Sequence, residues 1–237
     1  MRILALESSG LVASVAVVDE DQTVAEYTVN YKKTHSQTLL PMLDEMMKML
    51  EADLDTIDAI AVSGGPGSFT GLRIGSATAK GLGLALEKPL IHIPTLEALA
   101  YNLCGTGGLV CPIMDARRKQ VYTGIYAFEN QQMRVIEEQN AIGIDQLAGK
   151  LNQKGMPVTF LGDGVPVHRE FLKEQLTVPY VFAPAHMNSQ RGASVGALGV
   201  IYYKDGKIES AASHQPDYLR VSQAERERAE RQQKGEV

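Results

Sequence analysis

Residues 57–86 read IDAIAVSGGPGSFTGLRIGSATAKGLGLAL, the stretch of the chain with the clearest local pattern. An apolar run ends at Ser63, a glycine-rich loop follows at residues 64–67, and a long segment of small residues comes next. This order predicts a buried strand, a glycine turn and a helix. Such a loop could bind a phosphate, but its spacing matches neither the P-loop nor the dinucleotide fingerprint. A tight strand-to-helix connection is therefore the preferred interpretation.

Small residues recur every four positions along the predicted helix, at Gly71, Gly75, Ala79 and Gly83. Residues four apart lie on one face of a helix, so this stripe forms a groove with almost no side chains. Each interior glycine costs a helix about 0.5–1 kcal/mol relative to alanine, which indicates that another backbone packs closely against it. That backbone belongs either to this chain or to a second subunit.

The composition is typical of a globular protein. The chain has 237 residues, of which 44% are hydrophobic and 22% are charged. Its net charge is −5, so we do not expect it to bind nucleic acid tightly by itself. No apolar run approaches the ~18 residues of a membrane span and no signal peptide is evident, which predicts a soluble cytoplasmic protein. Cys104 and Cys111 are expected to be free thiols, and no metal-binding motif is present.

The first part of the chain predicts a three-stranded meander, with strands at residues 2–7, 11–19 and 23–30. Glu7 ends the first strand, where a carboxylate could bind a metal ion or a ribose, or could simply stabilise a turn.

A helix is predicted after Thr34, which with Gln37 has the form of a capping box. Pro41 either places the start of this helix near Thr38 or distorts its first turns. The apolar side chains of the helix cover an arc of roughly 180°, against the ~100° that one core contact requires. Its methionines could adapt to a partner surface. The helix is therefore either deeply buried or in contact with both its own core and another subunit.

The second half of the chain repeats the order of the first. A strand at residues 109–114 ends at the acidic Asp115, a hairpin follows, and a later strand at residues 158–161 enters the glycine turn Gly162-Asp163-Gly164. We interpret this order as a duplication. The predicted domains are a first lobe at residues 1–104, a second lobe at 105–221, and a charged, disordered tail at 222–237.

Two such meanders, each with an acidic first turn, resemble the actin, sugar-kinase and chaperone-ATPase superfamily. Within it, the chain resembles the family of bacterial tRNA threonylcarbamoyladenosine biosynthesis proteins TsaB, once called YeaZ. The segments that carry this resemblance are ILALESSG, THSQTLLP, SGGPGSFTGLRIGSATAKG, MDARRKQVYTGIY and PDYLR. The resemblance implies an α/β fold with two duplicated actin-like (ribonuclease H-like) lobes, each a mixed sheet with helices, the second lobe being shortened.

The resemblance also implies a non-catalytic role. In this family's pathway a threonylcarbamoyl group is attached to N6 of the adenosine beside the anticodon, in tRNAs that read codons beginning with adenine. The transfer is assigned to a catalytic paralogue, TsaD, which binds a metal ion through an HxxxH motif, and an ATPase, TsaE, joins the assembly. This chain has Pro94-Thr95-Leu96-Glu97-Ala98-Leu99 where the paralogue would carry its histidines, and His92 has no partner four residues on. We therefore expect no cofactor, no metal ion and no catalytic residue here.

Family members pair with themselves or with TsaD through first-lobe helices, and any contact with tRNA is expected to be indirect or weak. The predicted partner face consists of Leu39, Leu43, Met46, Met47, Gly71, Ile74, Gly75 and Thr78.

Two other function classes stay open. A nucleotide-dependent, kinase-like enzyme would use a vestigial nucleotide site made of Glu7, Asp115, Gly162 and Gly164. A protease is less well supported, because Ser8 and Ser9 have no histidine in a recognisable motif.

Overall fold

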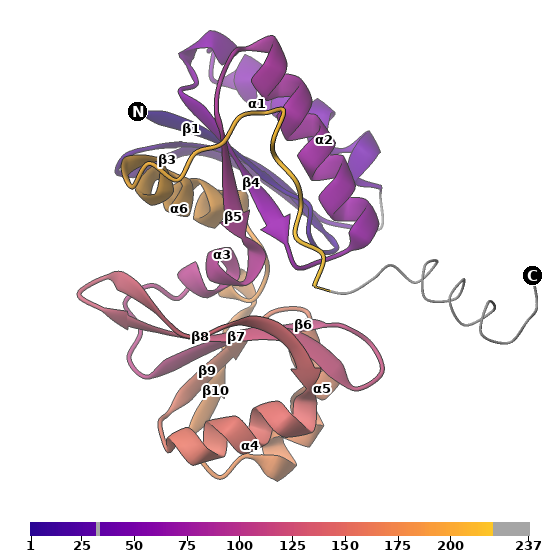
Figure 1. Ribbon diagram of the computed structural model, residues 1–237, viewed down its shortest axis with the longest axis vertical. Coiled ribbons are helices and arrows are strands. Elements are labelled where there is room, and N and C mark those ends of the chain that lie inside the picture. Colours follow the sequence, from indigo (N-terminus) through magenta and orange to yellow (C-terminus); the bar gives the residue numbers. More distant parts are fainter. Residues whose placement is uncertain (32–33, 220–237) are drawn as a thin grey trace, which may run out of the picture.

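The computed structural model describes residues 1–31 and 34–219, and it contains two lobes that are each built on a five-stranded sheet (Figure 1). The predicted tail at 222–237 lies outside the described residues, as does Arg220 of the PDYLR segment. Within the described part, no helix is both long enough and apolar enough to cross a membrane. Cys104 is exposed and Cys111 is buried, and both are free thiols, as expected.

The first sheet has the strand order β3-β2-β1-β4-β5. Strands β1, β2 and β3 form the predicted antiparallel meander, and β4 and β5 run parallel to β1. The apolar side chains of β1 and β4 are completely buried, as expected for strands covered by helices on both faces. The strands are β1 (Arg2–Glu7), β2 (Val12–Asp19), β3 (Gln22–Asn30), β4 (Ala59–Gly65) and β5 (Leu90–Pro94).

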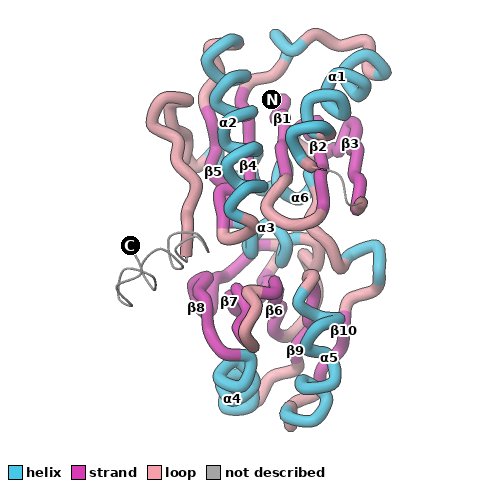
Figure 2. The backbone as a smooth tube through the Cα atoms, turned by 90° about the vertical axis from the view of Figure 1, so that its right-hand side faces the viewer, coloured by secondary structure: helices cyan, strands magenta, loops and turns pink. Residues whose placement is uncertain are grey.

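Helices α1 (Leu39–Met49) and α2 (Phe69–Ala85) cover one face of this sheet (Figure 2). The capping box predicted at Thr34 is wrong: its side chain makes no capping hydrogen bond, and residues His35–Gln37 form a short 3-10 turn instead. The helix begins after Thr38, so Pro41 lies in its first turn, where its missing N–H leaves no bond unmade. A second 3-10 turn, Leu54–Thr56, precedes β4.

The second sheet repeats the topology of the first, with the order β8-β7-β6-β9-β10. Its first three strands are again antiparallel and its last two run parallel to β6, so the inferred duplication is confirmed. The shortening of this lobe affects β9 and β10, which have 4 and 3 residues, rather than removing a strand. The elements are β6 (Leu109–Asp115), β7 (Gln120–Glu129), β8 (Gln132–Gly143), α4 (Ile144–Lys154), β9 (Val158–Leu161), α5 (Gly164–Gln175) and β10 (Tyr180–Phe182).

Each lobe ends in a helix that packs on the sheet of the other lobe. Helix α3 (Thr95–Tyr101) places Leu96 and Leu99 in the core of the second lobe, beside Tyr126. Helix α6 (Gly192–Lys204), which follows the 3-10 turn Ala185–Met187, places Val195 and Leu198 against the free face of the first sheet. The predicted boundary at 104/105 therefore separates the two sheets, but residues from Gly192 onward return to the first lobe.

After α6, the described chain ends in a segment, residues 205–219, that runs along the first lobe (yellow in Figure 1). We call it the C-terminal segment. Glu209 and Leu90 of β5 exchange two backbone hydrogen bonds of 2.9 Å, and the Lys80 ammonium donates to the carbonyl of His214 at 3.0 Å. The segment reaches the start of α2, where the rings of Tyr218 and Phe69 lie 4.6 Å apart. These contacts bring the end of the described chain to the junction of the two lobes.

Candidate functional site

A cleft of about 470 Å³ lies between the lobes. Turns from both halves of the duplication form its walls, because the carboxyl ends of β1 and β6 face the same space. The C-terminal segment contributes a third wall. The lining residues are Ser9, Gly10, Leu11, Gly67, Ser68, Phe69, Thr70, Met114, Asp115, Ala116, Arg117, Tyr122, Asp163, Asp217, Tyr218 and Leu219.

Glu7, one of the predicted nucleotide-site residues, does not line this cleft. Its side chain is completely buried, and its carboxylate accepts hydrogen bonds of 2.6 Å from the Ser9 amide and hydroxyl and a further one from the Ser63 hydroxyl. Burial raises the pKa of Glu7 above its ordinary value, although these hydrogen bonds favour the charged form. The residue therefore holds the β1–β2 turn together, the simpler of the two roles considered for it.

Asp115, the counterpart of Glu7 in the second lobe, does line the cleft and is exposed. Its backbone amide donates to Asp163 Oδ1 at 3.2 Å. Burial raises the pKa of Asp163, and the nearby Asp115 charge acts in the same direction. From the sequence, Asp163 was assigned only to a glycine turn. Its position two residues after the end of a strand, at the same sheet edge as Asp115, was the signal that could have placed it in the site.

Gly162 and Gly164 hold their turn against β6 rather than opening a cradle for a ligand. Gly162 has a φ of +108°, and a Cβ at this position would lie 2.2 Å from the carbonyl oxygen of Ile113. A Cβ on Gly164 would lie 2.9 Å from the same oxygen. Of the four residues predicted for a nucleotide site, the structure thus places only Asp115 on the cleft surface.

The glycine-rich stretch at residues 64–67 is likewise a tight connection, although β4 extends through its first two glycines instead of ending at Ser63. The Asp217 amide donates to the carbonyl of Gly64 at 2.6 Å, so the C-terminal segment covers the loop. Gly65 has a φ of +122°, and a Cβ there would lie 2.2 Å from the Asp217 carbonyl. One of the free amides at the helix start behind the loop is satisfied within the chain, because the Ser68 hydroxyl accepts from the Gly71 amide.

The residues predicted for a partner face lie mostly inside the first lobe. Four of them, Leu39, Leu43, Met46 and Met47, are at most 7% exposed and belong to the hydrophobic core beneath α1. Burial therefore accounts for only part of the wide apolar arc of this helix. The exposed apolar side chains of α1 are Leu40, at 52%, and Met49, at 70%.

The glycine stripe of α2 also faces its own chain. A Cβ on Gly71 would lie 2.1 Å from the backbone oxygen of Ser8, and one on Gly75 would lie 2.3 Å from the Ser8 hydroxyl. The closely packed backbone inferred from the stripe is therefore the β1–β2 turn, which corrects the assignment of both glycines to the partner face. Ile74 and Thr78 are the members of that predicted set that remain partly exposed.

The comparisons with known proteins agree with this architecture. Residues 22–228 match the family model described as TsaD, tRNA N6-adenosine threonylcarbamoyltransferase. The chain is 34% identical to the tRNA threonylcarbamoyladenosine biosynthesis protein TsaB of Bacillus subtilis, over 95% of this chain and 96% of that protein. The chain belongs to the TsaB family.

Other TsaB proteins support the same assignment. The Haemophilus influenzae protein is 29% identical over 93% of this chain and 94% of its own length. The solved structure of YeaZ from Pseudomonas aeruginosa superposes with a TM-score of 0.79 at 25% identity, over 92% of this chain and 99% of that one. The resemblance of the sequence to the TsaB family is thus confirmed over nearly the full length, as is the two-lobed α/β fold that it implied.

Proposed function

We propose that this TsaB-family chain is a non-catalytic scaffold or activator in the attachment of a threonylcarbamoyl group to N6 of the adenosine beside the anticodon, in tRNAs that read codons beginning with adenine. In this role it binds the catalytic paralogue TsaD and helps to recruit the ATPase TsaE. The full-length match to the B. subtilis TsaB protein is the observation that carries the proposal.

The structure of α3 supports an accessory role rather than a catalytic one. This helix follows β5, where the catalytic paralogue would carry its metal-binding histidines, and it contains none. The Thr95 hydroxyl instead accepts a hydrogen bond of 3.2 Å from the Gly65 amide, and Leu99 is buried in the core of the second lobe. Thr95 and Leu99 are thus occupied by contacts within the chain, which leaves them unavailable to a ligand.

The partner face that we propose is the outer surface of α1 and α2, which lie side by side on the first sheet (Figure 2). The buried members of the predicted set support this surface from beneath, whereas contact with TsaD or a second copy falls to exposed side chains. The proposed contact residues are Leu40 of α1 and Ile74 and Thr78 of α2. Leu40 and Ile74 bring apolar surface to this face, and apolar surface that reaches solvent is typical of protein interfaces.

Light scattering behind size exclusion tests this proposal, first on the chain alone and then on its mixture with TsaD from the same cell. We expect a homodimer that exchanges into a one-to-one heterodimer. Leu40→Glu and Thr78→Arg should weaken both complexes, because each places a charge in the interface. Val167→Glu is the matched control, since Val167 is 60% exposed on α5 of the other lobe. A chain that stays apart from TsaD, or equal binding by all three variants, would contradict the proposed face.

A kinase-like nucleotide enzyme is the alternative that one observation favours, namely the cleft with Asp115 exposed in its wall. Titration calorimetry with ATP and magnesium distinguishes the two functions. Tight binding with turnover would replace the accessory role by an enzymatic one, whereas the absence of turnover agrees with a scaffold.

A further inference from the structure

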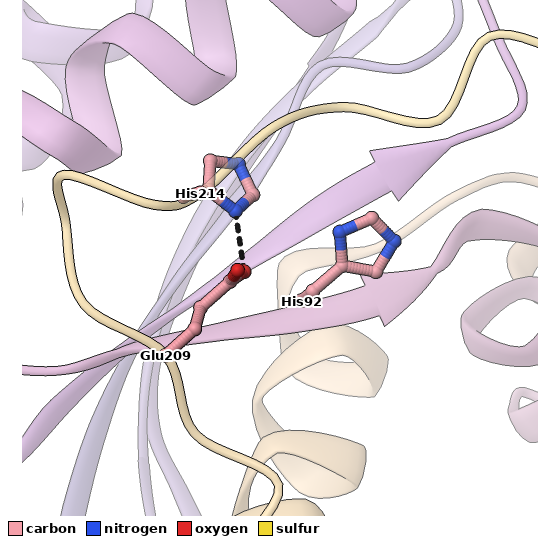
Figure 3. A group of neighbouring side chains, drawn as sticks. All are labelled: His92, Glu209 and His214. Atoms are coloured by element: carbon pink, nitrogen blue, oxygen red, sulfur yellow. Dashed lines mark hydrogen bonds and ion pairs between the residues drawn. The ribbon is translucent and has the colours of Figure 1, made fainter.

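Three side chains that commonly bind metal ions converge between β5 and the C-terminal segment (Figure 3). His92 projects from β5, and Glu209 and His214 come from the C-terminal segment. One potential ligand atom from each residue lies within 4.8 Å of the other two. Residues more than a hundred positions apart in the sequence therefore meet at one point of the first lobe.

His214 is the most constrained member of this group. Its side chain is completely buried, and its Nδ1 lies 2.6 Å from Glu209 Oε1. Its other ring nitrogen, Nε2, is buried and has no hydrogen-bond partner. A buried polar atom without a partner is uncommon, because it has lost its hydrogen bonds to water without replacing them. The His214 ring thus has one nitrogen held in place by a carboxylate and one that lacks a partner.

His92 also has a buried ring nitrogen without a hydrogen bond, but here it is the nitrogen that lies near a carboxylate. Its Nε2 lies 3.3 Å from Asp217 Oδ2, yet this buried nitrogen makes no hydrogen bond of acceptable geometry. The rings of His92 and His214 are 5.8 Å apart between centroids. Imidazoles that bind metal ions are commonly oriented by a carboxylate on the other ring nitrogen, and Asp217 is placed to supply such a carboxylate to His92.

We propose that His92, Glu209 and His214 bind a divalent transition-metal ion of the zinc class. Two imidazoles and a carboxylate are a ligand set that such ions favour, with metal–ligand distances of about 2.0–2.2 Å. Ligand atoms in a tetrahedral site lie about 3.3 Å apart at these bond lengths, so the 2.6 Å pair of His214 Nδ1 and Glu209 Oε1 must open and any wider separation within the group must close. His92 and Glu209 are 24% and 29% exposed, which leaves them room to move.

The role of the ion is to fasten the C-terminal segment to β5. Three residues beyond His214, Asp217 covers the glycine loop through its bond to Gly64, and Tyr218 stacks beside Phe69 in the wall of the cleft. Metal binding at His214 therefore stabilises both contacts. This site is separate from α3, where the catalytic paralogue would bind its ion, and its existence does not depend on the proposed accessory function.

Titration calorimetry with zinc on the full chain, without an affinity tag and after treatment with a chelator, tests the site. We expect equimolar binding that weakens by at least about tenfold in His92→Gln and in Glu209→Gln, because each removes one ligand. His186→Gln is the control, since His186 is an exposed histidine in the 3-10 turn before α6. Its affinity for zinc should equal that of the unmodified chain. Cobalt in place of zinc should give the visible absorption of a site with nitrogen ligands in the unmodified chain and in His186→Gln only.

Hydrogen exchange provides a second measurement, and its main comparison is made on the unmodified chain with and without zinc, so it does not depend on whether a variant folds. Zinc should slow amide exchange in residues 205–219 of the unmodified chain and leave it unchanged in His92→Gln. No zinc binding to the unmodified chain, or equal loss in all three variants, would overturn the proposal. Binding that leaves exchange in the C-terminal segment unaltered would overturn the fastening role.

Discussion

At the scale of single residues, the site is defined by which carboxylates reach solvent. Glu7 and Asp115 end equivalent strands, yet Glu7 is buried among serine hydroxyls and Asp115 is exposed in the cleft. Burial disfavours the charged form of a carboxyl group, so Glu7 has a raised pKa in the folded chain. At this equivalent position, Glu7 therefore stabilises the turn in the first lobe, whereas Asp115 in the second lobe is accessible to a ligand.

The raised pKa of Glu7 makes stability depend on pH. The folded chain keeps a proton on Glu7 at pH values where the unfolded chain has lost it, so the free energy of unfolding falls as the pH rises from about 4.5 through the raised folded pKa. Glu7→Gln keeps the shape of the side chain but has no carboxyl group to titrate, so it removes this contribution to the pH dependence of stability. Its stability relative to the unmodified chain should therefore increase with pH when urea unfolding is measured between about pH 5 and pH 8. Glu45→Gln, at an exposed position of α1, is the control. A stability difference between Glu7→Gln and the unmodified chain that stays constant with pH would contradict the raised pKa of Glu7.

At the scale of elements, α2 shows how a helix with many glycines is stabilised by its neighbours. Its stripe of small residues costs helix propensity, but it lets the β1–β2 turn approach the helix backbone. The Ser8 hydroxyl donates to the carbonyl of Gly71 at 2.8 Å, so the turn and the helix are also joined by a hydrogen bond. Close approach, rather than flexibility, explains the glycines of this face.

Two substitutions in α2 separate these effects. In Gly75→Ala the new Cβ would lie 2.3 Å from the Ser8 hydroxyl, so we expect a loss of about 1–3 kcal/mol in the free energy of unfolding. In Gly81→Ala the new Cβ meets nothing within 4 Å, and the better helix propensity of alanine should add about 0.5–1 kcal/mol. Urea denaturation measures both. Equal stability of the two variants would show that the stripe is not closely packed.

At the scale of the whole molecule, the two lobes are joined because the last helix of each packs on the sheet of the other. Helix α3 completes the core of the second lobe, and α6 completes that of the first. The two helices also contact each other, since the Tyr202 hydroxyl donates to Glu97 Oε2 at 2.5 Å. Neither lobe has a complete core without a helix from the other half of the chain, so we expect both to unfold together.

A core deletion in α6 tests this coupling. Leu198 is 2% exposed and packs on the first sheet, so Leu198→Ala should lower the free energy of unfolding by about 2–5 kcal/mol. Hydrogen exchange should show the loss of protection in β1 and β4, although α6 follows the second sheet in the chain. Ile201→Ala on the same helix removes a side chain that is 39% exposed and should cost much less. A loss of protection against hydrogen exchange that is confined to the second lobe would contradict the conclusion that α6 completes the core of the first lobe.

Local pattern in the sequence determined the elements of this protein. The apolar run before Ser63 and the glycines behind it predicted β4 and its turn, and alternation predicted both meanders, because such patterns depend on neighbours in the chain. The repeated order of acidic strand ends and glycine turns predicted the duplication. The motif around residues 63–81 carried much of the resemblance to the TsaB family, which the comparisons confirm.

Only the tertiary structure decided which surfaces those elements bury. The amphipathic face of α1 and the glycine stripe of α2 could have faced a partner, and they face their own chain instead. Their partners are distant in sequence: Ser8 bonds to Gly71 across 63 residues, and His92 meets the C-terminal segment. The path of α6 back to the first sheet, the burial of Glu7 and the proposed metal site all depend on such long-range packing, because periodicity shows that a face is apolar but not what covers it.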